Sequence, residues 1–530
     1  MSERSERTGE HRTTLRVGID VGGTNTDAVV LDDDDRVIAT AKRPTSPDVT
    51  EGLRAALDAV LAELPDPQME QRVKRVMLGT THATNAILER RTLGRVAVLR
   101  LGAPATTSVP PLSEWPGDLR DTVAAGTAIV RGGYFVDGRE IAPLDVDAVR
   151  KFVATTPADA IAVAGVFSPA SADQENRVAE IIRAEVGDVP VSLSHEIGSL
   201  GLLERENATV LNAALYGVAR DVTAALHEAL TARGLEVETF FAQNDGTLMA
   251  VDYAARYPVL TIGSGPANSL RGAAYLSGVT DAIVADVGGT STDLGVLVGG
   301  FPRESAAAVE IGGVTTNFRM PDILSIALGG GTIVGAEPRS VGYRIGTEAL
   351  VFGGSTPTMT DAAVAAGRGA VGTRPVPEEW LERLALAVRA ADEAVADAVD
   401  RVALGRSRSG RADRPLVAVG GGAFLLADEV PGAREVIRPK HAEVANAVGA
   451  AIALASGRIE TIVPASGDGS SRARLIDNAK EEAAARAVAA GADPATVQIV
   501  ELSEIPLSYL PEPAVRLHVK AAGPLARQAG

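Results

Sequence analysis

The sequence of 530 residues contains no cysteine. Disulfide bridges, thiolate nucleophiles, zinc–thiolate sites and iron–sulfur clusters all need that side chain, so each of them is excluded. Histidine is also scarce, with six in the chain, and these show no spacing typical of a metal-ligand cluster. Aromatic residues make up only 3 %, so Val, Leu, Ile and Ala must fill the core.

Long apolar runs are missing as well. No run reaches the roughly 20 residues that a membrane-spanning helix needs. The first residues, MSERSERTGEHRTTLR, are polar and lack the apolar core of a secretory signal. We therefore expect a cytoplasmic protein with no membrane partner, and a disordered lead over residues 1–14.

Positive charge is in deficit, since 51 Lys and Arg stand against 68 Asp and Glu, for a net charge of −17. A nucleic-acid backbone is excluded as the main ligand, because phosphate contacts along a strand need a positive surface. A single nucleotide is still allowed, because a local nest of backbone N–H groups and a metal ion suffice to bind it.

One string of eight residues occurs twice, with a single difference. DVGGTNTD occupies Asp20 to Asp27 and DVGGTSTD occupies Asp286 to Asp293, each behind an apolar run. In both copies a second apolar run follows at once, which indicates a β-hairpin. Glycine lets the backbone approach a ligand closely, and successive N–H groups in such a turn can bind an anion. A plain turn would explain one copy, but the second copy favours two hairpins that hold one polyphosphate between them.

The two hairpins predict a set of nucleotide ligands. A carboxylate beside phosphate needs a metal between them, and Mg²⁺ often combines one or two carboxylates with phosphate oxygens. Asp20 and Asp286 are therefore the predicted Mg²⁺ residues. The predicted ATP-binding residues are Asp20, Gly22, Gly23, Thr24, Asn25 and Thr26 in the first hairpin, and Gly288, Gly289, Thr290, Ser291 and Thr292 in the second.

Together with two later stretches, the hairpins resemble the actin, sugar-kinase and Hsp70 superfamily. VAVGGGA (residues 417–423) is similar to its adenosine motif, which adds Gly420, Gly421 and Gly422 to the predicted nucleotide ligands. ANAVGAAIA (residues 445–453) is similar to its second connecting helix. The resemblance implies an α/β fold of two duplicated actin-like (ribonuclease H-like) ATPase halves around a nucleotide cleft, with a small C-terminal α+β unit.

We expect the halves to cover residues 15–198 and 199–462, with a linker and the small unit over 463–530. Few helix breakers interrupt residues 199–231, so a single helix is predicted there, and residues 237–241 are expected to begin the second half. The Gly- and Ser-rich residues 466–472 are predicted to be a linker.

Within the superfamily, the chain resembles the hydantoinase/oxoprolinase A-type family. The similar stretches are GIDVGGTNTDAVV, LGTTHATNAILER, LSHEI, ERENATVLNAAL, PVLTIGSGPANSLRGAAYL and DVGGTSTDLGVL. The resemblance implies ATP-dependent hydrolysis of a cyclic amide, of the hydantoin or 5-oxoproline type, through phosphorylation of the ring carbonyl. It also implies ATP and Mg²⁺ as cofactors. A B-type subunit, a neighbouring-gene protein or a homo-oligomer is the partner to expect.

Four residues are candidates for catalysis. Thr80 and Thr81 lie at a predicted strand-to-helix turn, which could bind an anion or a carbonyl group; the alternative is that Thr81 or Thr84 caps the helix. Asp27 and Asp293 end the two hairpin strings and could orient water or accept a proton. The alternative for these two is that each pairs with a basic residue.

One further pair, His195 beside Glu196, could act as a base or a metal ligand, or could be a solvated or structural pair. Three functions are consistent with the phosphate motifs: a cyclic amidohydrolase, a small-molecule kinase, and an ATP-gated regulator of another enzyme. Phosphoryl transfer depends mainly on positioning and electrostatics, so the motifs cannot choose among them, and only the family resemblance favours the amidohydrolase.

Overall fold

The computed structural model describes residues 14–46, 48–198, 200–305, 308–317, 319–335, 339–403, 414–464, 469–507 and 513–526. The predicted disordered lead lies outside these ranges except for Thr14. Within them, no helix combines the length and the apolar character that crossing a membrane requires.

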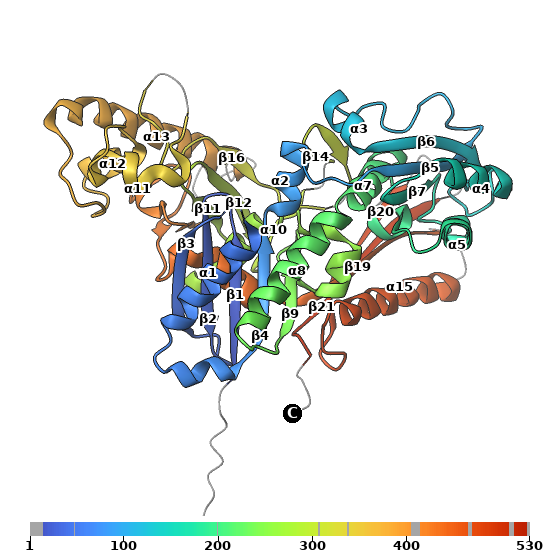
Figure 1. Cartoon of the computed structure of the whole chain (residues 1–530), viewed down its shortest axis with the longest axis horizontal. Helices are drawn as coiled ribbons and strands as arrows, with labels where there is room; N and C mark the ends of the chain where they lie inside the picture. Colours follow the sequence, from blue (N-terminus) through green and yellow to red (C-terminus); the bar gives the residue numbers. More distant parts are fainter. Residues whose placement is uncertain are drawn as a thin grey trace, which may run out of the picture.

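A nine-stranded sheet forms the centre of the molecule (Figure 1). Its order is β20-β21-β19-β10-β9-β4-β1-β2-β3. The strands are β1 Leu15–Val21, β2 Asn25–Leu31, β3 Val37–Pro44, β4 Val73–Thr80, β9 Glu238–Ala242, β10 Leu248–Ala250, β19 Ala455–Pro464, β20 Gln498–Leu507 and β21 Ala514–Gly523.

Side chains alternate between the two faces of this sheet. Val17 and Ile19 of β1 join the core under α1 (Val49–Ala62) and α8 (Tyr216–Ala232). Gly18, between them, faces α14 (Ala445–Ala451), where a Cβ would overlap the Ala447 carbonyl oxygen. The sheet is therefore covered on both faces.

A second sheet repeats the arrangement around the other hairpin. The antiparallel pair β11 (Ile283–Val287) and β12 (Thr292–Val298) corresponds to β1 and β2, and β17 (Leu416–Val419) lies parallel to β11 as β4 does to β1. The predicted α/β fold with a duplicated half is confirmed. The other strands of this sheet are β13 Phe301–Pro302, β16 Leu324–Ile326 and β18 Val436–Ile437, and its helices include α11 Ile345–Glu348, α12 Met359–Ala365 and α13 Leu381–Val402.

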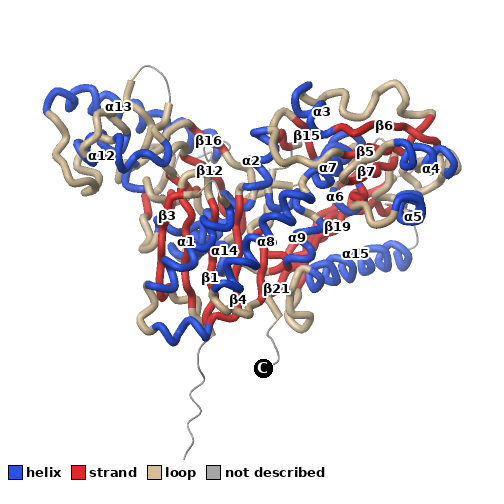
Figure 2. The backbone as a smooth tube through the Cα atoms, viewed as in Figure 1, coloured by secondary structure: helices blue, strands red, loops and turns tan. Residues whose placement is uncertain are grey.

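A third, four-stranded sheet is inserted within the first half. Its strands β5 (Val96–Ala103), β6 (Ala124–Arg131), β7 (Ala160–Gly165) and β8 (Val191–Leu193) are all parallel, in the order β6-β5-β7-β8. Figure 2 shows it at the opposite end of the molecule from α12 and α13. Its surroundings include α2 His82–Glu89, α3 Gly117–Val123, α4 Val146–Thr155, α5 Asp173–Val186, α6 Ser194–Ile197 and the hairpin β14 Val309–Ile311 with β15 Val314–Thr316.

The single helix predicted over residues 199–231 is wrong. Two helices occur there, α7 (Leu202–Ala214) and α8. The Gly94 N–H donates to the Ala214 carbonyl oxygen at 2.9 Å, and so takes an acceptor that a continuing helix would use. The strand β9, expected to begin the second half, instead lies beside β4 in the large sheet.

The C-terminal residues extend the large sheet. β21 pairs with β19 along its whole length, and β20 forms the outer edge. α15 (Gly469–Ala489) packs against β19 and β21, so residues 469–472 begin a helix, whereas the sequence predicted a linker; residues 466–468 lie outside the described ranges. The predicted domain boundaries stay predictions.

Two helices cross tightly between the two halves. A Cβ on Gly272 of α10 (Ser264–Ser277) would overlap the Ala445 carbonyl, and one on Gly449 of α14 would overlap the Asn268 carbonyl. Small residues in ANAVGAAIA therefore permit the close crossing. The remaining short elements are α9 Val251–Arg256 and the 3₁₀ turns η1 Pro67–Arg72, η2 Pro258–Thr261, η3 Gly342–Arg344, η4 Leu350–Phe352, η5 Glu378–Trp380, η6 Ala423–Leu425 and η7 Ala442–Val444.

Candidate nucleotide and metal site

The two hairpins have the same register and face each other. Asp20 pairs with Asp27 across the first, and Asp286 pairs with Asp293 across the second. Both turns close through the same bond, Gly22 N to the Asn25 carbonyl at 3.0 Å and Gly288 N to the Ser291 carbonyl at 2.9 Å. The tips lie side by side, since a Cβ on Gly289 would be 3.6 Å from Thr24 Cγ2. The predicted hairpin ligands are thus brought together.

Adjacent residues of α10 hold the two leading carboxylates. Asn268 Nδ2 donates to Asp20 Oδ1 at 3.1 Å, and Ser269 Oγ donates to Asp286 Oδ2 at 2.5 Å. Burial raises the pKa of Asp20 and of Asp286 to about 6 each, against the opposing hydrogen bonds. A buried negative charge without a basic partner favours a bound cation.

A glycine on each parallel neighbouring strand makes room for these carboxylates. A Cβ on Gly79, at the end of β4, would overlap Asp20 Oδ1, and one on Gly420, after β17, would overlap Asp286 Oδ1. The LGTTH and VGGGA strings are therefore structural counterparts. The signal that the two strings share is a glycine at the end of an apolar strand.

The donor set at Asp20 and Asp286 fits Mg²⁺. Both are carboxylates, the hard oxygen ligands that Mg²⁺ takes in small numbers while it keeps several waters. Burial raises their pKa, and a cation would relieve that cost. The described residues contain no group of three or more His, Asp or Glu arranged to hold an ion, so any metal there would depend on water and phosphate oxygens for its other ligands.

The predicted phosphate turns leave open space beside two glycines. A Cβ on Gly23 or on Gly421 would meet nothing within 4 Å, and both residues are exposed. By contrast, Gly330 and Gly331 of the LGGGT string donate to the Gly288 and Gly289 carbonyls at 3.0 and 2.7 Å. The LGGGT string, residues 328–332, therefore holds the second hairpin through backbone hydrogen bonds.

The two trailing aspartates differ in their surroundings. Asp27 pairs with Lys42 Nζ at 2.5 Å and accepts from Asn446 Nδ2 at 2.9 Å, as the basic-partner alternative anticipated. Asp293 accepts from Ser325 Oγ at 2.5 Å. Burial raises the pKa of both carboxyls. Catalytic roles for Asp27 and Asp293 stay predictions.

Thr80 and Thr81 lie at the end of β4, beside the first hairpin. Thr81 donates from both its N–H and its hydroxyl to the Val21 carbonyl, at 3.2 and 3.1 Å. Thr81 occupies the N-cap position of α2, as the capping alternative expected, but its side chain makes no capping bond. The Thr84 hydroxyl donates to the Ile262 carbonyl at 2.6 Å.

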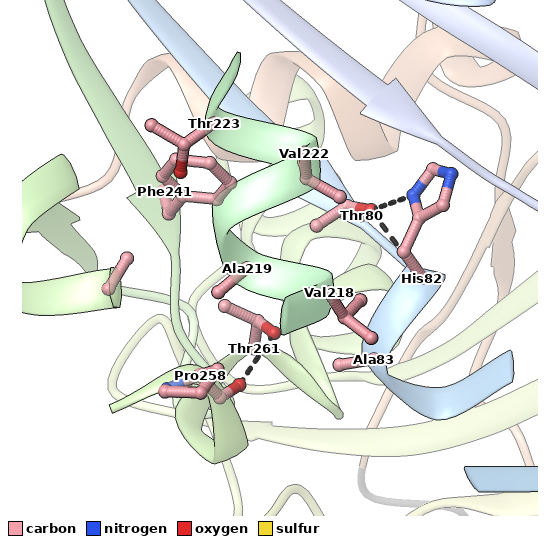
Figure 3. A pocket seen from close by; sticks show the side chains of 11 residues that line it. Thr80, His82, Ala83, Val218, Ala219, Val222, Thr223, Phe241, Pro258 and Thr261 are labelled. Atoms are coloured by element: carbon pink, nitrogen blue, oxygen red, sulfur yellow. Dashed lines mark hydrogen bonds between the residues drawn. The ribbon is translucent and has the colours of Figure 1, made fainter. Parts of the chain in front are cut away.

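A small cavity opens next to Thr80 (Figure 3). Thr80 Oγ1 lies 2.5 Å from His82 Nδ1, and burial lowers the pKa of His82, which favours a neutral ring. The lining combines these polar groups with apolar walls from α8, β9 and η2. It consists of Thr80, His82, Ala83, Val218, Ala219, Val222, Thr223, Phe241, Ala254, Pro258 and Thr261.

The His195 and Glu196 pair does not exist as such. His195 Nδ1 lies 2.6 Å from Glu175 Oε2, whereas Glu196 pairs with Arg256 at 2.5 Å. Glu175 is buried and also accepts from Gly165 N and Ser194 Oγ. Burial raises the pKa of Glu175, but its interactions with His195 and Ser194 outweigh burial and hold that pKa below its usual range. Sequence spacing could not reveal a partner twenty residues upstream.

Comparison with known proteins identifies relatives of the whole arrangement. A family model described as the hydantoinase/oxoprolinase N-terminal region matches residues 16–186, and one described as hydantoinase/oxoprolinase matches residues 205–370. The gamma subunit of acetophenone carboxylase from Aromatoleum aromaticum is 30 % identical, over 66 % of this chain and 53 % of that protein. Caprolactamase subunit alpha from Pseudomonas jessenii is 28 % identical, over 66 % and 54 %. The chain thus spans about half the length of these relatives in alignment.

Two solved structures share the fold. The crystal structure of ATP-dependent caprolactamase from Pseudomonas jessenii has a TM-score of 0.75 at 21 % identity, covering 97 % of this chain and 88 % of that one. A nucleotide-free acetone carboxylase structure has a TM-score of 0.69 at 17 % identity, with the same coverage.

Proposed function

The chain belongs to the hydantoinase/oxoprolinase family, and we propose that it is an ATP-dependent cyclic amidohydrolase, or the ATPase subunit of one. The observation that carries the proposal is the facing pair of hairpins, with Asp20 and Asp286 held by neighbouring residues of α10. A site that binds one polyphosphate from both sides needs this symmetry.

Each part of the site has a proposed task. The hairpin tips, Gly23 to Asn25 and Gly289 to Ser291, bind the phosphates through backbone N–H groups and side-chain donors, and Gly420 to Gly422 border the adenosine. The predicted ligands Gly22 and Gly288 instead close the turns with their N–H groups, and Thr26 and Thr292 are buried in the strands. Mg²⁺, held at Asp20 and Asp286, would supply positive charge beside the phosphates. Thr80, at the turn beside the first hairpin, orients the amide carbonyl, and Thr81 fixes that turn through its two hydrogen bonds to the Val21 carbonyl.

Phosphorylation solves the chemical difficulty of the substrate. An amide carbonyl is a poor electrophile because nitrogen donates into it. Transfer of the γ-phosphoryl group to the carbonyl oxygen makes the carbon open to attack by water. Water adds to that carbon, the ring nitrogen takes a proton and leaves as an amine, and the resulting acyl phosphate is hydrolysed at carbon. One ATP and two waters are consumed per ring opened.

The relatives support activation of a carbonyl more firmly than any one substrate. Their names refer to a lactam in one case and a ketone in the other, and a carbonyl oxygen is the group that both share. Both are named as subunits, so we propose that this chain also works with a partner subunit. A ring substrate of the hydantoin, 5-oxoproline or lactam type remains the proposal for this chain.

The test measures ATP turnover across hydantoin, 5-oxoproline and caprolactam, with and without the products of neighbouring genes. We expect ring opening in a one-to-one ratio with ADP. Oxygen-18 placed in the ring carbonyl should appear in the released phosphate. Ring opening without ATP, or phosphate free of the label, would contradict the mechanism.

The same assay separates the two other functions. A kinase would release ADP with a phosphorylated product and no free phosphate. A regulator would hydrolyse ATP slowly, independently of any cyclic amide, and faster with a protein partner. Neither outcome is expected from the amidohydrolase.

A further inference from the structure

Lys42 lies on β3, directly opposite Asp27 of the first hairpin. Its Nζ is 2.5 Å from Asp27 Oδ1, and its side chain is 34 % exposed while that of Asp27 is 6 % exposed. The ammonium group therefore lies at the border between the buried hairpin and open space. A lysine head on a flexible four-carbon stem can move from such a position to a new acceptor.

The charge balance of the hairpins singles this residue out. They contribute four aspartates, Asp20, Asp27, Asp286 and Asp293, and each is buried or half-buried. Hydroxyl or amide groups donate to all four. Among the described residues, Lys42 is the only basic residue that forms an ion pair with any of these four carboxylates.

The influence of Lys42 extends to the second hairpin. Its charge lowers the pKa of Asp286 as well as that of Asp27, against the larger effect of burial. The charge of Lys42 thus acts on a carboxylate of each hairpin, and the tips of the two hairpins lie side by side. A triphosphate brings strong negative charge into a site that already holds four carboxylates, and phosphoryl transfer relies on cations to offset it.

Asp27 does not depend on Lys42 alone. Asn446 Nδ2 donates to Asp27 Oδ2 at 2.9 Å and to Asp20 Oδ2 at 3.0 Å, so an amide partner remains if the ammonium group leaves. The amide also links Asp27 to the carboxylate proposed to hold the metal. Movement of Lys42 would thus leave both carboxylates hydrogen-bonded.

We propose that Lys42, within the ATP site proposed above, leaves Asp27 when nucleotide binds and donates to the terminal phosphate of ATP. Lys42 is then a catalytic residue that neutralises the transferring phosphoryl group. Asp27 is the partner that Lys42 has in this structure and would give up. The structural alternative is that Lys42 only neutralises Asp27.

Calorimetry with ADP and with a non-hydrolysable ATP analogue separates these readings without any cyclic amide. Lys42→Met should weaken the analogue roughly tenfold to a hundredfold, the range for one charge-assisted hydrogen bond, and leave the ADP affinity nearly unchanged. Lys42→Arg should recover part of the loss. The control Arg43→Met changes the next residue of β3, which is exposed, and should match wild type for both nucleotides.

A second measurement needs no variant, so it does not depend on Lys42→Met folding. Acetylation of surface lysines, read by mass spectrometry, should be blocked at Lys42 by the ATP analogue but not by ADP, while the exposed Lys74 reacts in every sample. If Lys42→Met weakened the affinity for both nucleotides equally, or if Lys42 reacted with the analogue bound, the proposed role of Lys42 would be wrong while the ATP site would stand. Failure of wild type to bind either nucleotide would overturn the ATP site itself.

Discussion

Asp286 shows most clearly that the buried carboxylates of the candidate site reduce the stability of the fold. It has no basic partner among the described residues, accepts a single hydrogen bond, from Ser269, and has a pKa raised to about 6 by burial. A carboxyl whose folded pKa lies above its ordinary value stabilises the fold while it is protonated. That contribution is complete below the unfolded pKa near 4 and is lost as the pH rises through about 6.

Asp286→Asn should therefore stabilise the nucleotide-free protein at pH 7.5 and have little effect at pH 4.5. The gain at pH 7.5 should be on the order of 2 kcal/mol, because the amide keeps an acceptor for Ser269 and removes the buried charge. Melting temperature against pH checks this. Asp281→Asn, at an exposed carboxyl five residues away, is the control; a gain independent of pH, or one shared by the control, would contradict the prediction.

Other residues of the site could not be read from the sequence. Asp20, Asp286 and their glycines stand out because a string repeats. Asn268, Ser269 and Asn446 lie in stretches that resemble the family, but nothing in those stretches marked these three side chains as partners of the carboxylates. They reach the carboxylates only because α10 and α14 cross there. Lys42 was missed because register across β2 and β3, and not sequence spacing, brings it to Asp27.

Among the helices and strands, the sequence predicted those whose formation depends on residues nearby in the chain. Each hairpin follows from an apolar strand, a Gly-Gly turn and a second apolar strand, and both were found. The break between α7 and α8 has a distant cause, the Gly94 N–H on the Ala214 carbonyl, and helical spacing alone did not show it. ANAVGAAIA was expected to form a connecting helix, but neither its close crossing with α10 nor its partner Gly272 was predicted.

Gly272→Ala and Gly449→Ala should each destabilise the protein by about 1–3 kcal/mol or more, since the new Cβ would overlap backbone of the facing helix. Gly217→Ala is a matched control in α8, where a Cβ meets nothing within 4 Å. It should be neutral or stabilising by up to about 1 kcal/mol, the usual preference for alanine in a helix. Denaturant unfolding measures all three, and equal stability of the crossing variants and the control would contradict the packing described.

At the scale of the whole molecule, the sheets do not follow the chain in two consecutive blocks. β9, β10, β19 and the C-terminal β20 and β21 all return to the sheet that begins with β1. Sequence order placed β9 and β10 with the second half because nothing local marks which sheet a buried strand joins. The crossing of α10 and α14 joins the two halves, each of which carries one of the two hairpins.

This arrangement predicts that nucleotide binding brings the two halves closer together in solution. A ligand that contacts both hairpins favours the state in which the halves are close, and short connecting segments absorb the motion. Small-angle X-ray scattering should show a smaller radius of gyration with Mg²⁺ and a non-hydrolysable ATP analogue than without. The double variant Asp20→Ala, Asp286→Ala lacks the proposed metal carboxylates and should show no such change. Superimposable profiles for wild type with and without the analogue, at concentrations where calorimetry shows binding, would mean that the halves do not move.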